Sequence, residues 1–211
     1  RAQPERMDFV AELARRWVEL ARVPNPQKRI ALILANYPTR DGRIGNGVGL
    51  DTPAAALNIL RALQARGYPL DCRLPESGTA LIQDLLGGVS NDLVSLDLRP
   101  CMQSLALDEY WTMFNRLPEA NRQAVIERWG MPETDPMFRS GRLMVAGLRF
   151  GLTFVGIQPA RGYQVDASAV YHDPDLVPPH GYLAFYFWLR NTYGAHAVVH
   201  VGKHGNREWL P

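Results

Sequence analysis

The sequence contains few cysteines, and this scarcity argues against the classes of protein that are stabilised by disulfides or cysteine-bound zinc. Cys72 and Cys101 are the two cysteines among 211 residues, and they lie far apart, outside any CxxC pair. A disulfide framework or a zinc knuckle needs more cysteines at closer spacing, so the pattern argues against both. This usage is typical of a reducing compartment, and we expect a cytoplasmic protein.

Long apolar runs and a strong charge of one sign are also missing. The most apolar short run, YLAFYFWL at 182–189, is far shorter than the roughly 20 residues that cross a bilayer. The charged start RAQPERMDF contains no apolar signal-peptide core. The net charge is only +2, without the concentrated basic face of a nucleic-acid binder. We therefore expect no membrane span and no nucleic-acid partner, while the slight positive balance is compatible with an anionic small molecule.

Apolar patterning predicts both strands and helices. Runs without alternation predict strands buried on both faces at 30–35, 152–157 and 197–201. Apolar residues at helical spacing, together with caps and breakers, predict helices at 5–22, 53–67, 79–88, 104–117 and 119–130, and a buried helix in GYLAFYFWLRNTYG. The segment 131–143 is interpreted as a loop.

These elements predict the fold class and the domain organisation. We expect an α/β protein with a buried, largely parallel sheet, flanking helices and long irregular loops. Residues 1–211 are interpreted as one α/β domain, with a leading helix and linker at 1–26 and the α/β region at 27–211. Ligands in such folds gather where strands end and loops begin, and each expected strand ends in a polar loop.

The glycine-rich segment GNGVG at 45–49 follows the first expected strand. It departs from a dinucleotide fingerprint because Leu50 stands where the third glycine is needed, and no GK[ST] phosphate-binding loop occurs in the sequence. One interpretation is a long turn that needs positive φ angles. The other is an anion site built from backbone N–H groups and the helix start at residue 53, reinforced by Arg40, Arg43 and Asn46.

Two further polar segments follow expected strands or prolines. In IQPARGY, Gln158 and Arg161 lie just past a strand end, where polar side chains can face a ligand, although a surface turn shaped by Pro159 is an equal alternative. His180 in PPHGY follows two prolines that restrict its backbone, and a single histidine is more often structural. We assign His172 to structure.

Metal-binding and proton-transferring side chains gather in VVHVGKHGNREWLP and just before it. They are His196, His200, His204 and Glu208. A helix would align them, but the valines favour a strand, and each glycine weakens a helix by about 1 kcal/mol. We therefore predict a strand at 197–201 and a glycine turn that projects His204 and Glu208. Histidine and carboxylate suit a divalent metal such as cobalt or zinc, or proton transfer near neutral pH. The alternative is a turn whose imidazoles bond backbone carbonyls.

Several of these segments together resemble one family. HVGKHGNREWLP, RIALILANYPTRDGRIGNGVGLDTPAAALNILRALQARGY, FVGIQPARGY and YHDPDLVPPHGYLAFYFWLRNTYGAHAVVH are similar, in order, to segments of the cobaltochelatase large subunit (CobN) family, shared in looser form with the H-type subunits of magnesium chelatase. Members are much longer, so the resemblance implies that this chain is a fragment of a larger chelatase subunit. One departure is Arg207, beside Glu208, where the family usually has leucine.

The resemblance implies a ligase that forms nitrogen–metal bonds in cobalamin biosynthesis. Such enzymes insert Co(II), their substrate metal, into hydrogenobyrinic acid a,c-diamide, while separate AAA+ partner subunits bind and hydrolyse the ATP. Metal insertion requires a base for the ring protons and an exchangeable ligand that delivers the ion. We hypothesise that Glu208 and His204 form this base and metal-delivery pair, with His200 as a supporting metal ligand.

The anionic corrinoid precursor carries peripheral carboxylates, which suggests where it binds. We expect substrate contacts from Arg43, Asn46, the amides around Gly47 and Gly49, and Arg161, with Gln158 and His180 lining the pocket. Three alternatives remain open. They are a magnesium chelatase H-like subunit, a metal-dependent hydrolase that uses the terminal histidines and glutamate, and a non-catalytic tetrapyrrole-binding or partner-docking module.

Overall fold

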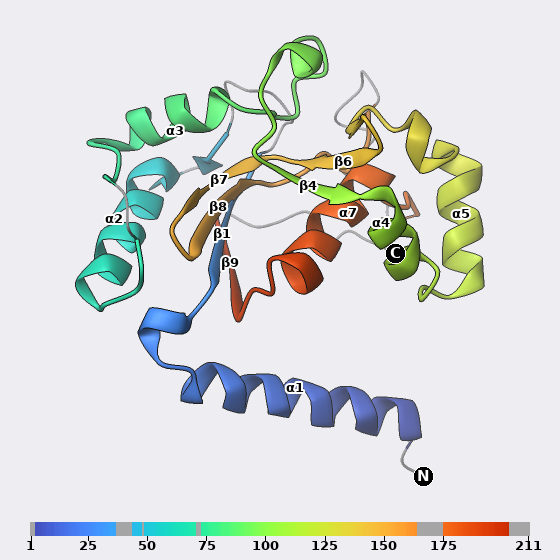
Figure 1. Ribbon diagram of the computed structural model, residues 1–211, viewed down its shortest axis with the longest axis horizontal. Coiled ribbons are helices and arrows are strands. Elements are labelled where there is room, and N and C mark those ends of the chain that lie inside the picture. Colours follow the sequence, from blue (N-terminus) through green and yellow to red (C-terminus); the bar gives the residue numbers. More distant parts are fainter. Residues whose placement is uncertain (1–2, 37–43, 48, 71–72, 164–174, 203–211) are drawn as a thin grey trace.

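The computed structural model describes residues 3–36, 44–47, 49–70, 73–163 and 175–202 (Figure 1). A four-stranded sheet in the order β7-β8-β1-β9 lies at its centre. Its strands are β1 (Ile30–Leu34), β7 (Gly147–Phe150), β8 (Thr153–Ile157) and β9 (Ala197–Val201). Strand β1 pairs in parallel with both β8 and β9, and β7 runs antiparallel at one edge. The expected α/β class with a largely parallel sheet is confirmed.

The two central strands are buried on both faces, as their unbroken apolar runs predict. Every residue of β1 and β8 is buried. The third predicted strand has the expected bounds, but the prediction that it is buried is wrong. Val198 and Val199 are each 40% exposed, because β9 lies at the edge of the described sheet. Local sequence cannot distinguish an apolar edge strand from a central one.

Helices flank the sheet and, as Figure 1 shows, fall into two groups. At one end lie α2 (Thr52–Ala65) and α3 (Gly78–Leu86), and at the other lie α4 (Leu107–Phe114), α5 (Glu119–Trp129) and α7 (His180–Phe187), which continues as the π-helix η5 (Trp188–Thr192). The predicted cap of α2 is present, since the Asp51 carboxylate accepts a hydrogen bond from Ala54 N at 3.0 Å. Gly130 and Gly194 follow helices with φ of 78° and 65°, as expected for helix stops.

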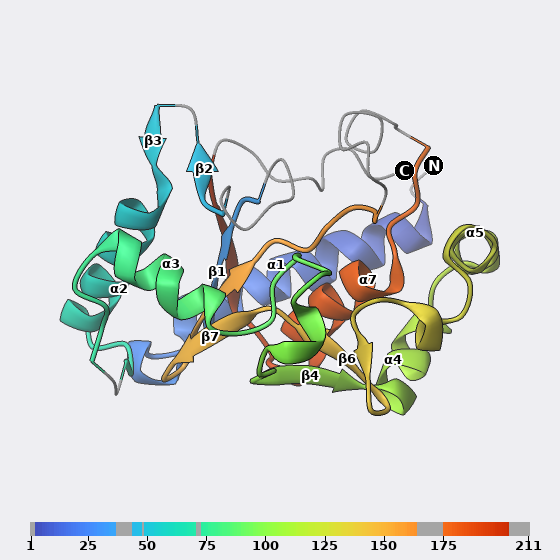
Figure 2. The same ribbon diagram turned by 90° about the horizontal axis from the view of Figure 1, so that it is seen from above.

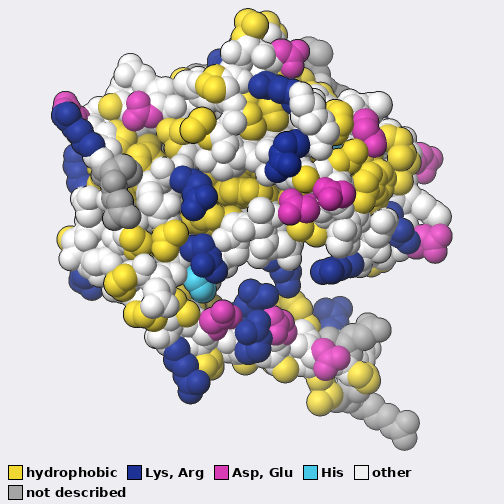
Figure 3. All heavy atoms as spheres, in the orientation of Figure 1, with side chains coloured by type: hydrophobic (Ala, Val, Ile, Leu, Met, Phe, Trp, Pro, Cys, Tyr) yellow, Lys and Arg dark blue, Asp and Glu magenta, His cyan; other side chains and the backbone are white. Residues whose placement is uncertain are grey.

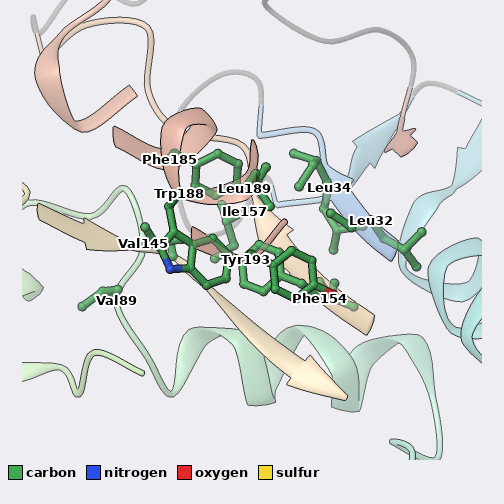
Figure 4. Packing of buried hydrophobic residues seen from close by; sticks show 14 of the residues in the cluster. Leu32, Leu34, Val89, Val145, Phe154, Ile157, Phe185, Trp188, Leu189 and Tyr193 are labelled. Carbon is green, nitrogen blue, oxygen red and sulfur yellow. The ribbon is translucent and has the colours of Figure 1, made fainter. Parts of the chain in front are cut away.

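The π-helix and α7 fill the core against the sheet (Figure 4). The ring of Phe154 on β8 contacts the rings of Phe185, Trp188 and Tyr193, with centroids 4.9 to 6.2 Å apart. The Tyr193 hydroxyl lies 3.0 Å from Ile30 O and 2.6 Å from Leu152 O. The predicted buried helix is confirmed, and its packing holds β1 and β8 together.

Smaller elements complete the described fold. A second sheet has the order β4-β6-β5, and a short hairpin pairs β2 with β3. Their bounds are β4 (Gln103–Ala106), β5 (Phe138–Arg139), β6 (Arg142–Val145), β2 (Asn46–Gly47) and β3 (Leu50–Asp51), with 3-10 turns η1 (Asn25–Gln27), η3 (Leu96–Leu98) and η4 (Pro132–Thr134). The loop interpretation of 131–143 is therefore wrong, since η4, β5 and part of β6 form there. The strand β4, which pairs with β6, is distant in sequence.

Helix α1 (Pro4–Arg22) lies apart from the sheet in Figure 1, and in Figure 2 it runs behind the sheet and α7. Its apolar stripe is exposed, with Phe9 64% and Trp17 65% accessible, and none of its residues joins the hydrophobic core of the described chain. Charged side chains gather on the side of α1 that faces the viewer at the bottom of Figure 3. Ion pairs of Glu12 with Arg15 and Arg16 lie along one exposed face of the helix and join residues three and four positions apart. Within the described residues, no helix is both long and apolar enough to cross a membrane.

Candidate functional site

The carboxyl ends of β1, β8 and β9 lie at one edge of the sheet, because the three strands are parallel neighbours. The segments that leave this edge are hydrogen-bonded to the adjacent strands. Gln158 N donates to Leu34 O at 3.0 Å, and Ala35 N donates to Val201 O at 3.2 Å. Backbone hydrogen bonds therefore hold these three strand ends in fixed positions relative to one another.

Gln158 is the first residue after β8, and its side chain is 1% exposed. Neither Oε1 nor Nε2 has a hydrogen-bond partner among the described residues. Buried polar groups are nearly always paired, and an unpaired one costs about 1–3 kcal/mol. The unpaired amide at a strand end is the strongest indication of a ligand contact in the described part of the chain.

Arg161 follows three residues later and is fully buried. One guanidinium nitrogen donates to Leu176 O at 3.3 Å. An arginine remains protonated when buried, so a positive charge lies inside this edge of the sheet. The burial of both Gln158 and Arg161 rules out the alternative that IQPARGY is only a surface turn.

His200 lies on β9, opposite Ile33 of β1 and one residue before the strand ends. Its ring stacks on the ring of Tyr186 from α7, with centroids 6.2 Å apart and planes 21° apart. Tyr186 in turn contacts Tyr182 at 5.1 Å. The imidazole is thus held by aromatic packing beside the strand end. This contact was not evident from the sequence, because Tyr182 and Tyr186 belong to an uninterrupted apolar run.

His196 lies before the start of β9, away from the strand ends. Its Nδ1 accepts a hydrogen bond from Arg29 N at 2.9 Å, and burial together with the Arg29 charge lowers its pKa. Four residues of strand separate it from His200 by about 13 Å. His196 therefore cannot share one metal ion with His200. Its imidazole instead accepts a backbone hydrogen bond at the amino end of β1.

The glycine segment forms a tight hairpin next to this edge. Ile44 forms a bridge with Asn36, the second residue after β1, and Gly45 and Gly49 have φ of 68° and 79°. The turn interpretation is therefore confirmed at these glycines. The start of α2 already has an anion in the carboxylate of Asp51, so any anion contact from this segment depends on the hairpin amides around Gly47 and Gly49.

Three of the predicted site residues, Arg43, His204 and Glu208, lie outside the described residues. Asn46 is placed by its backbone in β2. Within the described residues, no group of three or more His, Cys, Asp or Glu side chains could hold a metal ion. The structure thus places Gln158 and Arg161 just beyond the end of β8, and His200 near the end of β9, on the other side of β1. The metal-delivery pair remains a prediction.

His180 is fully buried at the start of α7, and both of its ring nitrogens have protein partners. Nδ1 lies 2.5 Å from the Tyr110 hydroxyl, and Nε2 lies 2.9 Å from Gly130 O. A carbonyl only accepts, so Nε2 carries the proton and Nδ1 accepts from Tyr110. A substrate contact would have to replace one of these bonds, so the geometry assigns His180 to the packing of α7 against α4.

His180 should make the protein less stable as the pH is lowered. Burial lowers its pKa below the ordinary 6.5, outweighing the opposing effects of the Gly130 hydrogen bond, Asp135 and Glu133. Below pH 6.5 the unfolded chain binds the proton more readily than the folded chain, so the free energy of unfolding decreases as the pH falls. We expect His180→Gln to reduce stability at neutral pH by about 1–3 kcal/mol and to flatten this decrease.

Denaturant titrations of both proteins between about pH 8 and pH 5 measure this effect. His196→Gln is the comparison, because the pKa of His196 is also lowered but its ring is more exposed, so this variant should flatten the decrease less than His180→Gln does. An unchanged pH dependence in His180→Gln would remove His180 as its source.

Comparison with known proteins identifies the class of protein. The family described as CobN/Magnesium Chelatase matches residues 1–211, and the chain belongs to this family of chelatase subunits. The resemblance noted in the sequence is thereby confirmed.

Individual members of the family differ in how similar they are to this chain. The chain is 79% identical over 210 residues to the aerobic cobaltochelatase subunit CobN of Pseudomonas aeruginosa, covering 100% of this chain and 17% of that protein. It is 34% identical over 209 residues to the H-type magnesium-chelatase subunit of Chlorobaculum parvum, covering 98% and 16%. The solved catalytic subunit of cobaltochelatase from Mycobacterium tuberculosis superposes with a TM-score of 0.83 at 42% identity, covering 100% and 18%. The chain spans about a sixth of the length of these relatives.

Proposed function

We propose that this chain supplies part of the macrocycle-binding and metal-insertion site of a cytoplasmic cobaltochelatase. The reaction is insertion of Co(II) into hydrogenobyrinic acid a,c-diamide, with ATP hydrolysed by AAA+ partner subunits. The observation that carries the proposal is the buried amide of Gln158, which has no hydrogen-bond partner among the described residues and lies just past the end of β8. The buried charge of Arg161 follows three residues later. Residues 27–211 act as one α/β domain, and 1–26 as a leading helix and linker.

The degree of similarity supports cobalt rather than magnesium as the inserted metal. Identity is 79% and 50% to two aerobic cobaltochelatase subunits, and 34% and 27% to H-type magnesium-chelatase subunits from Chlorobaculum parvum and rice. A subunit must match both the ring and the ion, so the closer branch is the better guide to the substrate. The magnesium chelatase H-like alternative therefore has less support.

The substrate is a ring with an acidic periphery, and several residues of this chain are suited to bind it. Arg161 offers positive charge, the hairpin around Gly47 and Gly49 offers backbone amides, and Arg43 and Asn46 extend this group. Gln158 contributes a donor and an acceptor, which the periphery of the ring would satisfy. These contacts bind and orient the ring without taking part in proton transfer.

Metal insertion forms nitrogen–metal bonds and displaces the proton that the ring nitrogens hold. Glu208 accepts a proton from a ring nitrogen, and His204 delivers Co(II) after the ion loses bound water. His200, next to the end of β9 and stacked on Tyr186, supports the metal ligand. ATP turnover in the partner subunits closes or deforms the site around the ring.

The direct test is titration of hydrogenobyrinic acid a,c-diamide into the complete subunit that contains this chain. We expect a change in the visible absorption of the ring on binding, and a second change when Co(II), ATP and the AAA+ partners are present. Stoichiometric zinc with no affinity for the ring would instead indicate a metal-dependent hydrolase. Ring binding without insertion in the reconstituted complex would indicate a binding or docking module.

A further inference from the structure

Asn91 is a polar residue that no motif in the sequence indicates, and its side chain is tied to the candidate site. Nδ2 donates to Gln158 O at 2.8 Å, and Oδ1 accepts from Ala160 N at 3.1 Å. These are the carbonyl of one residue and the amide of the second residue after it. A neighbouring strand would bond the same two groups in a sheet, so the Asn91 amide replaces a strand partner just beyond β8.

Pro159 lies between the two bonded residues, and its ring fixes φ there while it supplies no N–H of its own. Two hydrogen bonds from one planar amide fix the backbone on both sides of the proline. They thereby set the direction of the Gln158 side chain and the path of the chain to Arg161.

The loop that carries Asn91 is itself held firmly. One nitrogen of Arg99 donates to the buried Ser90 Oγ at 3.1 Å and to Leu86 O at 3.1 Å. The Asp92 carboxylate accepts from Ser95 Oγ at 2.5 Å and lies 3.5 Å from an Arg99 nitrogen. The hydrogen bond from Ser95 lowers the pKa of Asp92, so this carboxylate stays charged near neutral pH. The loop that carries Asn91 is therefore held in place by hydrogen bonds and an ion pair on both sides of this residue.

We infer that Asn91 is a positioning residue for substrate binding, which holds Gln158 and Arg161 at the orientation that the macrocycle requires. This role rests on the proposed function. Asn91 acts mainly through Gln158, whose carbonyl it bonds directly, and makes no contact with the ring itself. A side chain misplaced by about 1 Å can lose a large part of its contribution to binding or catalysis.

The experiment compares ring affinity in the complete subunit for Asn91→Ala, Gln158→Met and the double variant. We expect Asn91→Ala to weaken binding of hydrogenobyrinic acid a,c-diamide about 10-fold. The double variant should bind the ring with nearly the same affinity as Gln158→Met, because Asn91 acts largely through Gln158. A purely structural residue would give effects that add. Asn25→Ala is the matched control, since Asn25 makes a similar tie to Arg66 O at 2.9 Å, near the amino end of β1.

Four outcomes would overturn the inference. Wild-type affinity in Asn91→Ala, with weaker binding in Gln158→Met, would refute the role of Asn91 and leave the site intact. Additive losses of affinity in the double variant, or an equal loss in Asn25→Ala, would mean that Asn91 only contributes to the stability of the fold. Wild-type affinity in Gln158→Met would remove the proposed site and the inference with it. If Asn91→Ala does not fold, Asn91→Asp serves instead, because it keeps the acceptor for Ala160 N and loses the donor to Gln158 O.

Discussion

Glu208→Gln in the complete subunit is expected to abolish cobalt insertion while leaving ring binding nearly unchanged. Glutamine has the shape and polarity of glutamate but cannot accept and carry away a ring proton near neutral pH. Positioned general bases contribute about 10²- to 10⁴-fold to rate, so we expect a loss of at least about 100-fold. Insertion is measured by the visible absorption of the ring with Co(II), ATP and the partner subunits.

Two comparisons isolate this effect. Glu127→Gln makes the same chemical change on an exposed position of α5 and should insert cobalt at the wild-type rate. Affinity for the ring without metal should stay within about twofold in both variants, because Glu208 is assigned to proton transfer rather than to binding. Wild-type turnover in Glu208→Gln would remove this residue from the mechanism, and loss of ring binding would reassign it to substrate contact.

Gln158→Met is expected to raise stability and to weaken ring binding at the same time. Methionine has a similar shape, so it fills the space of Gln158 while removing two buried polar atoms that lack partners among the described residues. Removing such atoms should stabilise the unliganded protein by about 1–2 kcal/mol. The same change removes the donor and acceptor proposed to face the ring, so affinity should fall at least about 10-fold.

A gain of stability together with a loss of ring affinity distinguishes a ligand contact from a residue that only supports the fold. Gln103→Met is the control, because Oε1 of Gln103 is also buried without a described partner but lies in β4, in the smaller sheet. That variant should gain stability and keep its affinity for the ring. Chemical denaturation and ring titration measure the two quantities. A loss of stability in Gln158→Met would mean that its amide is satisfied within the protein.

The sequence predicted those features that depend on residues close together in the chain. Strands at 30–34 and 153–157 follow from apolar runs, and the strand at 197–201 follows from its valines. The start of α2 follows from Asp51 and Pro53. Glycine at residues 130 and 194 marks helix ends because the backbone adopts positive φ there. The position of Gln158 and Arg161 at a strand end was likewise evident, because it needs only the end of one apolar run.

The tertiary structure decided which strands are central, which polar groups are buried and which loops support the site. Strand β9 is apolar and yet exposed at its middle, because its burial depends on whether another strand lies beside it. Asn91 bonds to residues 67 and 69 positions away, and Tyr186 reaches His200 through the packing of α7 on the sheet. These contacts form only when distant segments meet in the folded chain, so neither periodicity nor local motifs contain them.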